Sequence, residues 1–302
     1  MRKILLNCDN TMGLKDKPLD DGLALMYLLG REDVEILGVT TTFGNGNVDD
    51  VHNATLTMFN DLNIPNIPLH KGADLGQDRI SDASRFLVEM VNKYPNEVTI
   101  LGLGSLSNLY GAYLLDKDFY NKVGEIVLMG GITKPFIIKG KLMNELNFSC
   151  DHQATYNVLT SGYNLFDAGC KLTIMTGHIG LQAEFGNKVY GILNNSEIDS
   201  YDYIKEKAYT WTEYVLKNYD RSVFYNWDIV AAMYITNPEL FDENYRNVVS
   251  TMNDLKSGYL RIDNDADDND YKINIPTEIK DVDMFNGLIL EAWKNVNMNY
   301  QI

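Results

Sequence analysis

The chain has 302 residues, of which 45% are hydrophobic, and its formal net charge is −16 at pH 7. So negative a chain is a poor partner for a nucleic-acid backbone or an anionic membrane surface. Three cysteines, Cys8, Cys150 and Cys170, fit buried thiols in a reducing compartment better than a disulfide framework. We see no signal-peptide pattern and no membrane-spanning apolar run, so we expect a cytoplasmic protein.

The first predicted strand, residues 4–6, is apolar and is followed by polar residues up to Asp9. After a loop, Asp20 and Asp21 begin a segment with helical spacing, where acidic side chains suit the positive end of the helix dipole. In open α/β sheets such strand-to-helix junctions bind ligands. We therefore expect Asp9, Asp20 and Asp21 to converge.

Three converging carboxylates repel one another unless they share a cation or a proton. The group offers oxygen donors and no His or Cys, which suits a hard divalent ion, Ca²⁺ or Mg²⁺. The alternative interpretation is structural. In that case Asp20 caps the helix, Asp21 is solvated and Asp9 only ends a strand.

Strands and helices then alternate along the chain. Strands are predicted at residues 34–42, 67–70, 98–103, 125–129 and 171–175, with helices at 50–62, 86–94, 107–115 and 151–160. This alternation predicts an α/β fold with a doubly wound, mostly parallel sheet. No repeat and no linker rich in Pro, Gly or Ser interrupts it, so we expect a single domain over residues 1–302. Residues 72–84 are predicted to form a loop, a candidate lid.

The last third contains a long, aromatic-rich helix at residues 198–219 and a closing amphipathic helix at 282–295. Residues 252–263 and 271–275 are predicted to form a late β-hairpin. The acidic turn between them, 264–270, lacks the central Gly and terminal Glu of an EF-hand, so we interpret it as a solvated turn.

Further polar residues follow the predicted strands or begin helices. Asn45 follows the second strand, and Glu145 and Asn147 stand among apolar neighbours. His178 follows the strand at 171–175, where a lone histidine is more often a hydrogen-bonded core residue than a catalyst. Asp228 begins a late apolar helix.

Six of these features resemble the motifs of the nucleoside hydrolases, the inosine-uridine-preferring family. The first is Asp9 followed by an Asp20-Asp21 pair that begins a helix. The others are TTTFGN at 40–45, LGSLSN at 103–108, VLMGG at 127–131, ELNFSCD at 145–151 and Trp227-Asp228. Each motif alone is weakly specific, but six in the right order make the resemblance strong from residue 4 to about residue 235.

The resemblance implies a Ca²⁺-dependent enzyme that hydrolyses the N-glycosidic bond of ribonucleosides to base and ribose. The implied Ca²⁺ ligands are Asp9, Asp21, the backbone oxygen of Leu103 and Asp228. Asp9 is also the implied base, accepting a proton from a water whose acidity the cation raises. The resemblance also implies that Asp20 and Asn45 hold ribose hydroxyls and that Glu145 and Asn147 hold the 5′-hydroxyl. The family likeness further implies nucleoside salvage and a homodimer or homotetramer.

The sequence departs from the family pattern in several places. Asn7 stands where the family usually has its first Asp. The loop before Asp20 is seven residues longer than usual and contains another carboxylate, Asp16. The ribose-binding Asn that precedes Glu145 in many members has no clear counterpart here.

The last departure concerns the leaving group. Trp227 stands where inosine-uridine members have a His proposed as the acid, and this resembles purine-preferring members that activate the base by aromatic stacking. We therefore expect Trp227 to stack on the base and purine nucleosides to be preferred. The competing hypothesis is that His178 supplies the proton.

Two other functions were weighed. The first strand also resembles that of haloacid-dehalogenase phosphatases, but their nucleophile is the first Asp of the motif. Here that residue is Asn7, whose amide cannot form an aspartyl-phosphate. The alternative that stays open is a nucleoside- or ribose-binding protein with the same site and no turnover.

Overall fold

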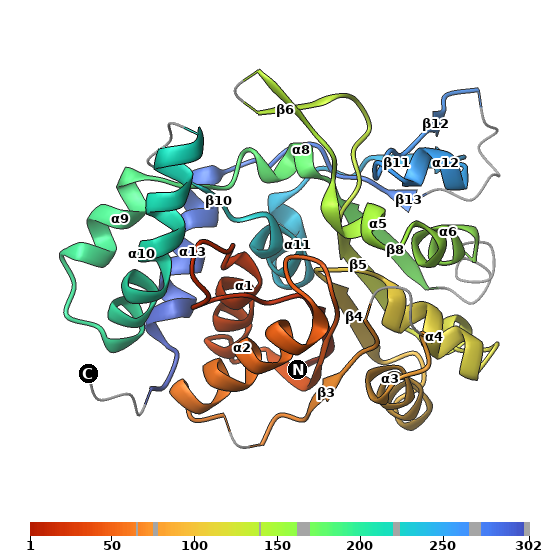
Figure 1. Ribbon diagram of the computed structural model, residues 1–302, viewed down its shortest axis with the longest axis horizontal. Helices are drawn as coiled ribbons and strands as arrows, with labels where there is room; N and C mark the ends of the chain where they lie inside the picture. Colours follow the sequence, from red (N-terminus) through yellow and green to blue (C-terminus); the bar gives the residue numbers. More distant parts are fainter. Residues whose placement is uncertain are drawn as a thin grey trace.

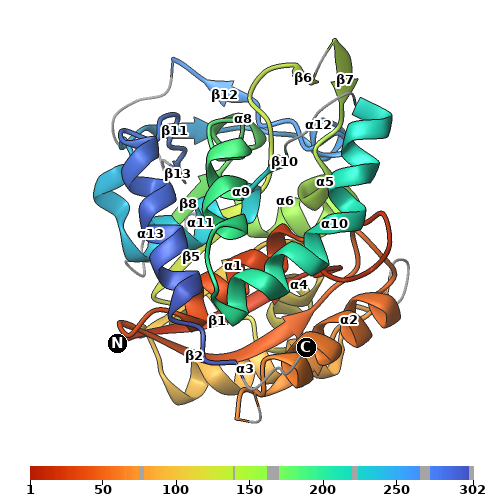
Figure 2. The same cartoon turned by 90° about the vertical axis from the view of Figure 1, so that its left-hand side faces the viewer.

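The computed structural model describes residues 1–64, 66–74, 78–138, 140–161, 170–219, 224–265 and 273–298. Within these residues the central sheet has nine strands in the order β12-β11-β13-β8-β5-β4-β1-β2-β3 (Figures 1 and 2). The strands are β1 Arg2–Cys8, β2 Val34–Thr41, β3 Leu69–Lys71, β4 Val98–Gly102, β5 Glu125–Met129, β8 Lys171–Met175, β11 Tyr245–Val248, β12 Ile262–Asp263 and β13 Ile273–Asn274. Seven of them, from β13 to β3, pair in parallel, whereas β11 is antiparallel to both of its neighbours.

Helices cover both faces of the sheet (Figures 1 and 2). They are α1 Asp20–Leu29, α2 Val48–Asp61, α3 Asp82–Lys93, α4 Ser107–Leu115, α5 Leu146–Cys150, α6 His152–Thr160, α8 Gly177–Gly180, α9 Asn187–Asn194, α10 Asp199–Tyr219, α11 Trp227–Thr236, α12 Met252–Leu255 and α13 Val282–Lys294, with 3₁₀ turns at Tyr120–Lys122 and Pro238–Leu240. None of the described helices has both the length and the apolar character needed to cross a membrane.

The alternation of side chains along β1 explains the two layers. Ile4 and Leu6 enter one core, which includes side chains of α1, α10, α11 and α13. Leu5 enters the other core, which includes side chains of α3, α4 and α6. A parallel strand buried on both faces is apolar at consecutive positions. The predicted α/β fold with a mostly parallel sheet is confirmed.

The predicted late hairpin is wrong. β12 and β13 lie on opposite sides of β11, so each pairs with β11 instead of with the other. Local sequence does not reveal β11, because the strand has four half-exposed or exposed residues and no apolar alternation. Met252 begins a short helix, which Thr251 caps by accepting from the backbone N–H of Asp254. Residues 266–272, most of the predicted acidic turn, lie outside the described residues.

Two short antiparallel pairs lie outside the main sheet. β6 (Phe136–Ile138) pairs with β7 (Lys141–Met143), and β9 (Glu184–Phe185) pairs with β10 (Phe224–Tyr225). The β6–β7 hairpin projects at the top of Figures 1 and 2, away from the sheet. Of the predicted lid, residues 75–77 lie outside the described residues.

Candidate active site

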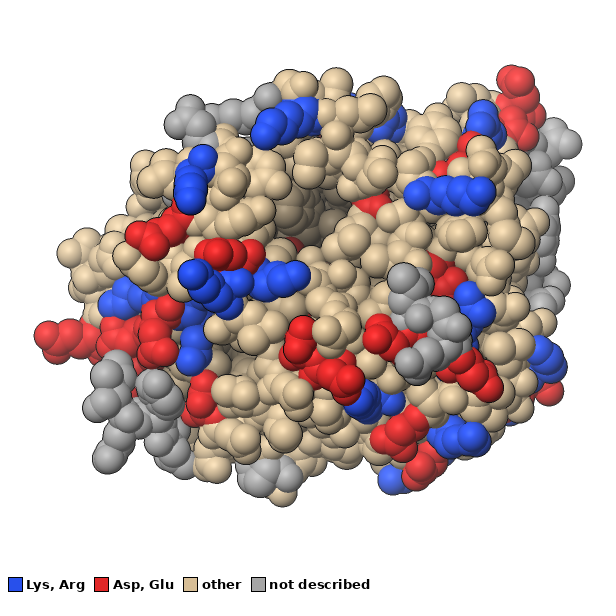
Figure 3. All heavy atoms as spheres, viewed as in Figure 1, with Lys and Arg blue, Asp and Glu red and all other residues tan. Residues whose placement is uncertain are grey.

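The candidate site is a cavity of about 160 Å³ that is lined by residues following the parallel strands. Figure 3 shows a hollow near the middle of this face. Its polar lining comes from Asp20, Asn45, Asp228, Glu145 and Asn147. The rest of the lining is mainly apolar and includes Phe136, Ile138, Met143 and Trp227. A cavity with both a polar and an apolar lining suits a ligand that has both kinds of surface.

Three buried carboxylates meet at the polar lining of the cavity. One oxygen from each of Asp20, Asp21 and Asp228 lies within 4.8 Å of the others. Asp20 and Asp21 begin α1, and Asp228 lies in the first turn of α11, a helix that packs against α1. The positive ends of two helix dipoles therefore face the same carboxylate group.

Burial and mutual repulsion make this group unfavourable without a cation. Burial raises the pKa of Asp20 to about 7. Burial also raises the pKa of Asp21 and Asp228, and the neighbouring carboxylates raise both further. Among the described residues, no ion pair with Lys, Arg or His involves these carboxylates. A hard divalent cation fits this all-oxygen donor set.

Asp9 adjoins the carboxylate group and is fully buried. Its backbone N–H donates to Asp21 Oδ1 at 3.1 Å, and its Oδ2 accepts from the backbone N–H of Asn45. Its Oδ1 is buried and has no hydrogen-bond partner. Burial raises the pKa of Asp9 to about 6, an effect that the Asn45 N–H partly offsets.

The turn after β2 passes close to Asp9, and this close approach depends on Gly44. A Cβ atom at Gly44 would lie 2.0 Å from Asp9 Oδ2, so only glycine lets the backbone pass here. The structure thus brings all four predicted aspartates together. It places Asp20 in the group of three, and Asp9, the implied metal ligand, beside that group. The individual roles of these residues stay predictions.

Glu145 and Asn147 lie at the cavity, but part of their hydrogen-bonding capacity is used by the fold. Glu145 caps α5 by accepting from the N–H groups of Asn147 and Phe148, at 2.7 and 2.9 Å. Burial raises its pKa to about 7. The Asn147 side chain donates to the carbonyls of Leu103 and Met129, at 2.8 and 3.1 Å. Leu103 keeps one lone pair for a metal, and Asn147 offers its side-chain oxygen to a ligand.

Trp227 lines the cavity, whereas His178 does not. The indole N–H of Trp227 donates to the Gly177 carbonyl at 3.3 Å, which fixes one edge of the ring. His178 packs edge-on against Phe136, a lining residue, with ring centroids 5.3 Å apart. Burial, and the charge of Lys134, lower its pKa below the ordinary value, so the ring is neutral at pH 7.

The sequence departures have structural explanations. Asn7 is buried, donates to the Ser105 carbonyl at 3.0 Å and accepts from Asn108 at 2.8 Å. In the long first loop, Lys17 donates to the Asn45 carbonyl at 2.6 Å. Asp16 in that loop is exposed and does not join the acidic group.

The predicted site does not include the apolar wall formed by Phe136, Ile138 and Met143. A signal was present in the run FIIKGKLM, where apolar residues flank a glycine between two lysines, as in a hairpin. Gly140 in the turn has a φ of +74°, which favours glycine. Phe136 pairs directly with Met143 across the hairpin, so both side chains face the cavity.

Comparisons with known proteins identify the family of the chain. A sequence model of the inosine-uridine preferring nucleoside hydrolases matches residues 4–286. Uridine nucleosidase 1 from Arabidopsis thaliana is 31% identical over 188 residues, which are 52% of this chain and 55% of that protein. The match therefore spans little more than half of this relative's length.

Two solved structures show the same fold. A plant nucleoside hydrolase superposes with a TM-score of 0.81 at 20% identity, covering 97% of this chain and 99% of its own. A purine-preferring ribonucleoside hydrolase from Gardnerella vaginalis superposes with a TM-score of 0.80 at 19% identity, covering 98% and 99%. With the match over residues 4–286, the chain belongs to the inosine-uridine preferring nucleoside hydrolase family.

Proposed function

We propose that the protein is a Ca²⁺-dependent N-ribohydrolase that cleaves ribonucleosides to free base and ribose. The observation that carries this proposal is the buried group of Asp20, Asp21 and Asp228, with Asp9 beside it, at the polar lining of the cavity. The polar lining suits a ribose, and the apolar lining suits a nucleobase. Family membership supports the same reaction class.

Calcium fits the donors present, because it accepts six to eight oxygens in a loose geometry. The ion would be held by Asp21, Asp228, the Leu103 carbonyl and the Asp9 carboxylate beside them. When bound, the ion would supply positive charge that lowers the pKa of a water and holds ribose hydroxyls.

The protein's own residues then divide the work. Asp9 accepts the proton of the attacking water as general base. The water oxygen bonds to C1′, and the electron pair of the breaking C1′–N bond leaves with the base. Asp20 and Asn45 hold ribose hydroxyls, and Glu145 and Asn147 hold the 5′-hydroxyl.

Negative charge on the departing base needs stabilisation. Trp227 and Phe136 belong to the apolar lining of the cavity, where an aromatic face can stack on a purine. We therefore propose a purine preference, although the Arabidopsis relative is named for uridine. His178, the competing acid, contacts Phe136 and does not line the cavity.

Incubation of the pure protein with purine and pyrimidine ribonucleosides, followed by a reducing-sugar assay, tests the proposal. We expect free ribose from purine nucleosides, loss of activity with a chelator and recovery with added Ca²⁺. Elemental analysis after dialysis should show calcium. Binding without ribose release from any nucleoside would support the alternative, a binding protein with this fold.

We further propose, from the family likeness, a cytoplasmic enzyme of nucleoside salvage that forms a homodimer or homotetramer. Light scattering after size-exclusion chromatography measures the oligomeric state directly. A mass of one chain, 34.3 kDa, would contradict that part of the proposal.

A further inference from the structure

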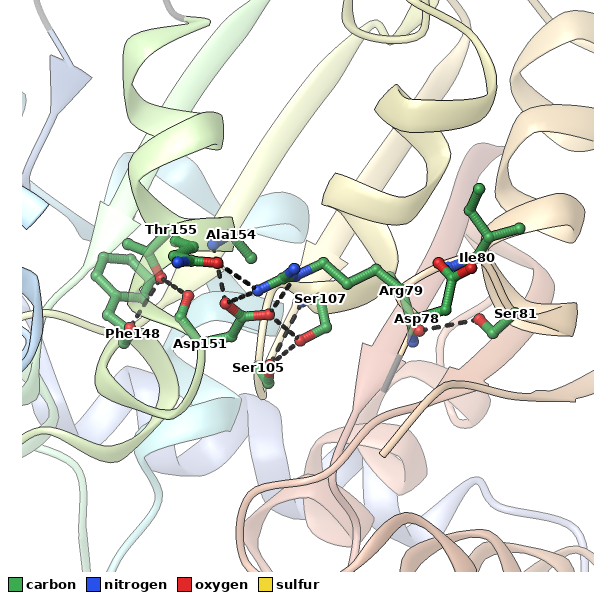
Figure 4. Close-up of polar contacts among 12 residues, drawn as sticks. Asp78, Arg79, Ile80, Ser81, Ser105, Ser107, Phe148, Asp151, Ala154 and Thr155 are labelled. Atoms are coloured by element: carbon green, nitrogen blue, oxygen red, sulfur yellow. Dashed lines mark hydrogen bonds and ion pairs between the residues drawn. The ribbon is translucent and has the colours of Figure 1, made fainter. Parts of the chain in front are cut away.

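Arg79 forms a two-point ion pair outside the cavity (Figure 4). Its Nε donates to Asp151 Oδ2 at 2.7 Å and its Nη2 donates to Asp151 Oδ1 at 2.8 Å. The Asp151 side chain is 8% exposed and the Arg79 side chain 26%. Hydrogen bonds to Arg79 and Ser107 hold the pKa of Asp151 below its ordinary value despite burial. The pair is therefore fully ionised at neutral pH.

Asp151 connects this arginine to the turn between β4 and α4. The Ser107 hydroxyl donates to Asp151 Oδ2 at 2.7 Å. Because that hydrogen is used, Ser107 accepts from the Ser105 hydroxyl at 2.8 Å. The Ser105 carbonyl in turn accepts from Asn7, on the strand that leads to Asp9. Figure 4 shows Arg79, Asp151, Ser107 and Ser105 as one connected row.

The same carboxylate joins α5, which contributes to the cavity lining, to α6. Asp151 follows α5 directly and caps α6 by accepting from the N–H of Ala154 at 3.1 Å. α5 has only five residues, which is too short to be stable without external contacts. Glu145 caps its start and Asn147 lies in its first turn, so the contacts of Asp151 help to hold both residues at the cavity.

The Arg79 side chain can be removed without releasing its backbone. α4 packs so closely on this segment that a Cβ at Gly111 would lie 2.1 Å from the Arg79 carbonyl oxygen. Ser81 and Ser84 form a capping box that begins α3 just after it. Loss of the guanidinium therefore mainly affects Asp151 and the segments that it holds.

We propose that Arg79 is a positioning residue for the ribose 5′ end. Its guanidinium fixes Asp151, which fixes α5 against the β4–α4 turn, and this sets where Glu145 and Asn147 meet the 5′-hydroxyl. The inference rests on the proposed function. A planar guanidinium is suited to the role because it holds both carboxylate oxygens at once, which an ammonium cannot do.

The test compares Arg79→Met and Arg79→Lys on the best nucleoside and on its 5′-deoxy analogue. For Arg79→Met we expect kcat/KM on the nucleoside to fall about tenfold or more, since small misplacements at a site are costly. On the 5′-deoxy analogue, which lacks the group to be positioned, we expect a loss below about threefold, and Arg79→Lys should lie between. The affinity for Ca²⁺ should stay within about twofold, because only the Leu103 carbonyl among the proposed ligands contacts α5, whereas Asp21 and Asp228 lie on α1 and α11.

Arg31→Met is the matched control. Arg31 also binds an aspartate at two points, Asp33 at 2.8 and 3.0 Å, and lies over the ring of Tyr27 as Arg79 lies over the ring of Tyr110. Arg31 precedes β2, at the amino ends of the parallel strands, whereas the cavity lies beyond their carboxyl ends. We expect the activity of this variant to stay within about twofold of wild type, since surface ion pairs contribute little.

Equal losses on the two substrates, or no loss in Arg79→Met, would overturn the inference. If Arg79→Met does not fold, Ser107→Ala replaces it, because this change removes only the hydroxyl that links Asp151 to the turn. If the wild type binds nucleosides without cleaving them, the proposed function is wrong. The inference is then tested on Kd, where the same 5′-hydroxyl-dependent loss is expected. Absence of both binding and cleavage would overturn both.

Discussion

Asp9 differs from the other acidic residues of the site because one of its oxygens is held and the other is free. Oδ2 accepts the Asn45 N–H, whereas Oδ1 is buried without a partner. Such an orphaned acceptor is costly unless a ligand, water or ion uses it. This arrangement leaves one oxygen of a fixed carboxylate available to take a proton.

We therefore predict that Asp9→Asn lowers kcat by at least about 10²–10⁴-fold, the usual contribution of a general base. The adjacent Cys8 is the control, since its side chain is in the core, 1% exposed. Cys8→Ala should keep turnover within a few-fold of wild type in steady-state assays. Near-normal turnover by Asp9→Asn would remove Asp9 from the mechanism.

The roles of Trp227 and His178 separate in a pair of variants. Base stacking on an aromatic ring contributes about 1–3 kcal/mol, so Trp227→Ala should lose most activity on a purine nucleoside. His178→Ala should lose little, because His178 does not line the cavity. If His178→Ala is instead inactive on nucleosides but normal on p-nitrophenyl riboside, His178 is the acid. A loss in Trp227→Ala that only follows lost stability would indicate a core role.

Two helix starts build the proposed metal site. α1 contributes Asp20 and Asp21, and α11 contributes Asp228, which lies 207 residues after Asp21 in the chain. Asp228 hydrogen-bonds to both of the others, which requires a proton among the three when no cation is bound. The packing of α1 on α11 thus forces acidic groups together that would separate in the unfolded chain.

Asp228→Asn should stabilise the metal-free protein, because an amide donates to Asp20 and Asp21 without adding charge. In chelator at about pH 8 we expect a higher Tm than wild type, by about 1–2 °C for each kcal/mol of relieved repulsion. The same variant should lose Ca²⁺ binding in isothermal titration calorimetry, since one anionic ligand is gone. A lower Tm together with intact Ca²⁺ binding would contradict the proposed site.

Across the entire fold, stability should depend on pH in the metal-free state. The pKa of Asp20 is raised from 3.8 to about 7 and that of Glu145 from 4.5 to about 7. The folded state therefore binds protons more tightly than the unfolded chain. The contribution of these two groups to stability is therefore fully present below their unfolded pKa values and is lost as pH rises through about 4 to 7.

Differential scanning calorimetry in chelator should accordingly show a lower Tm at about pH 7.5 than at about pH 5.5, within the range where these groups titrate. Added Ca²⁺ should raise Tm more at the higher pH, because it binds the ionised carboxylates and stabilises only the folded state. A Tm that increases with pH in chelator would mean that these carboxylates are already neutralised in another way.

Sequence patterns alone predicted the alternating strands and helices. The family motifs in the sequence placed Asp9, Asp21, Leu103 and Asp228 at strand and helix ends. These features are local, because they depend on apolar periodicity and on residues that terminate an element. The site residues then meet because parallel strands end at one edge of a sheet.

Other features depend on contacts between distant segments, which no local pattern encodes. β11 lies between β12 and β13 because a sheet edge accepts any strand that satisfies its hydrogen bonds, however exposed its side chains. Arg79 meets Asp151 across 72 residues, and the apolar wall with Phe136 forms only when the β6–β7 hairpin lies over the cavity. Local periodicity determines the elements, whereas packing of the folded chain determines which side chains share a buried site.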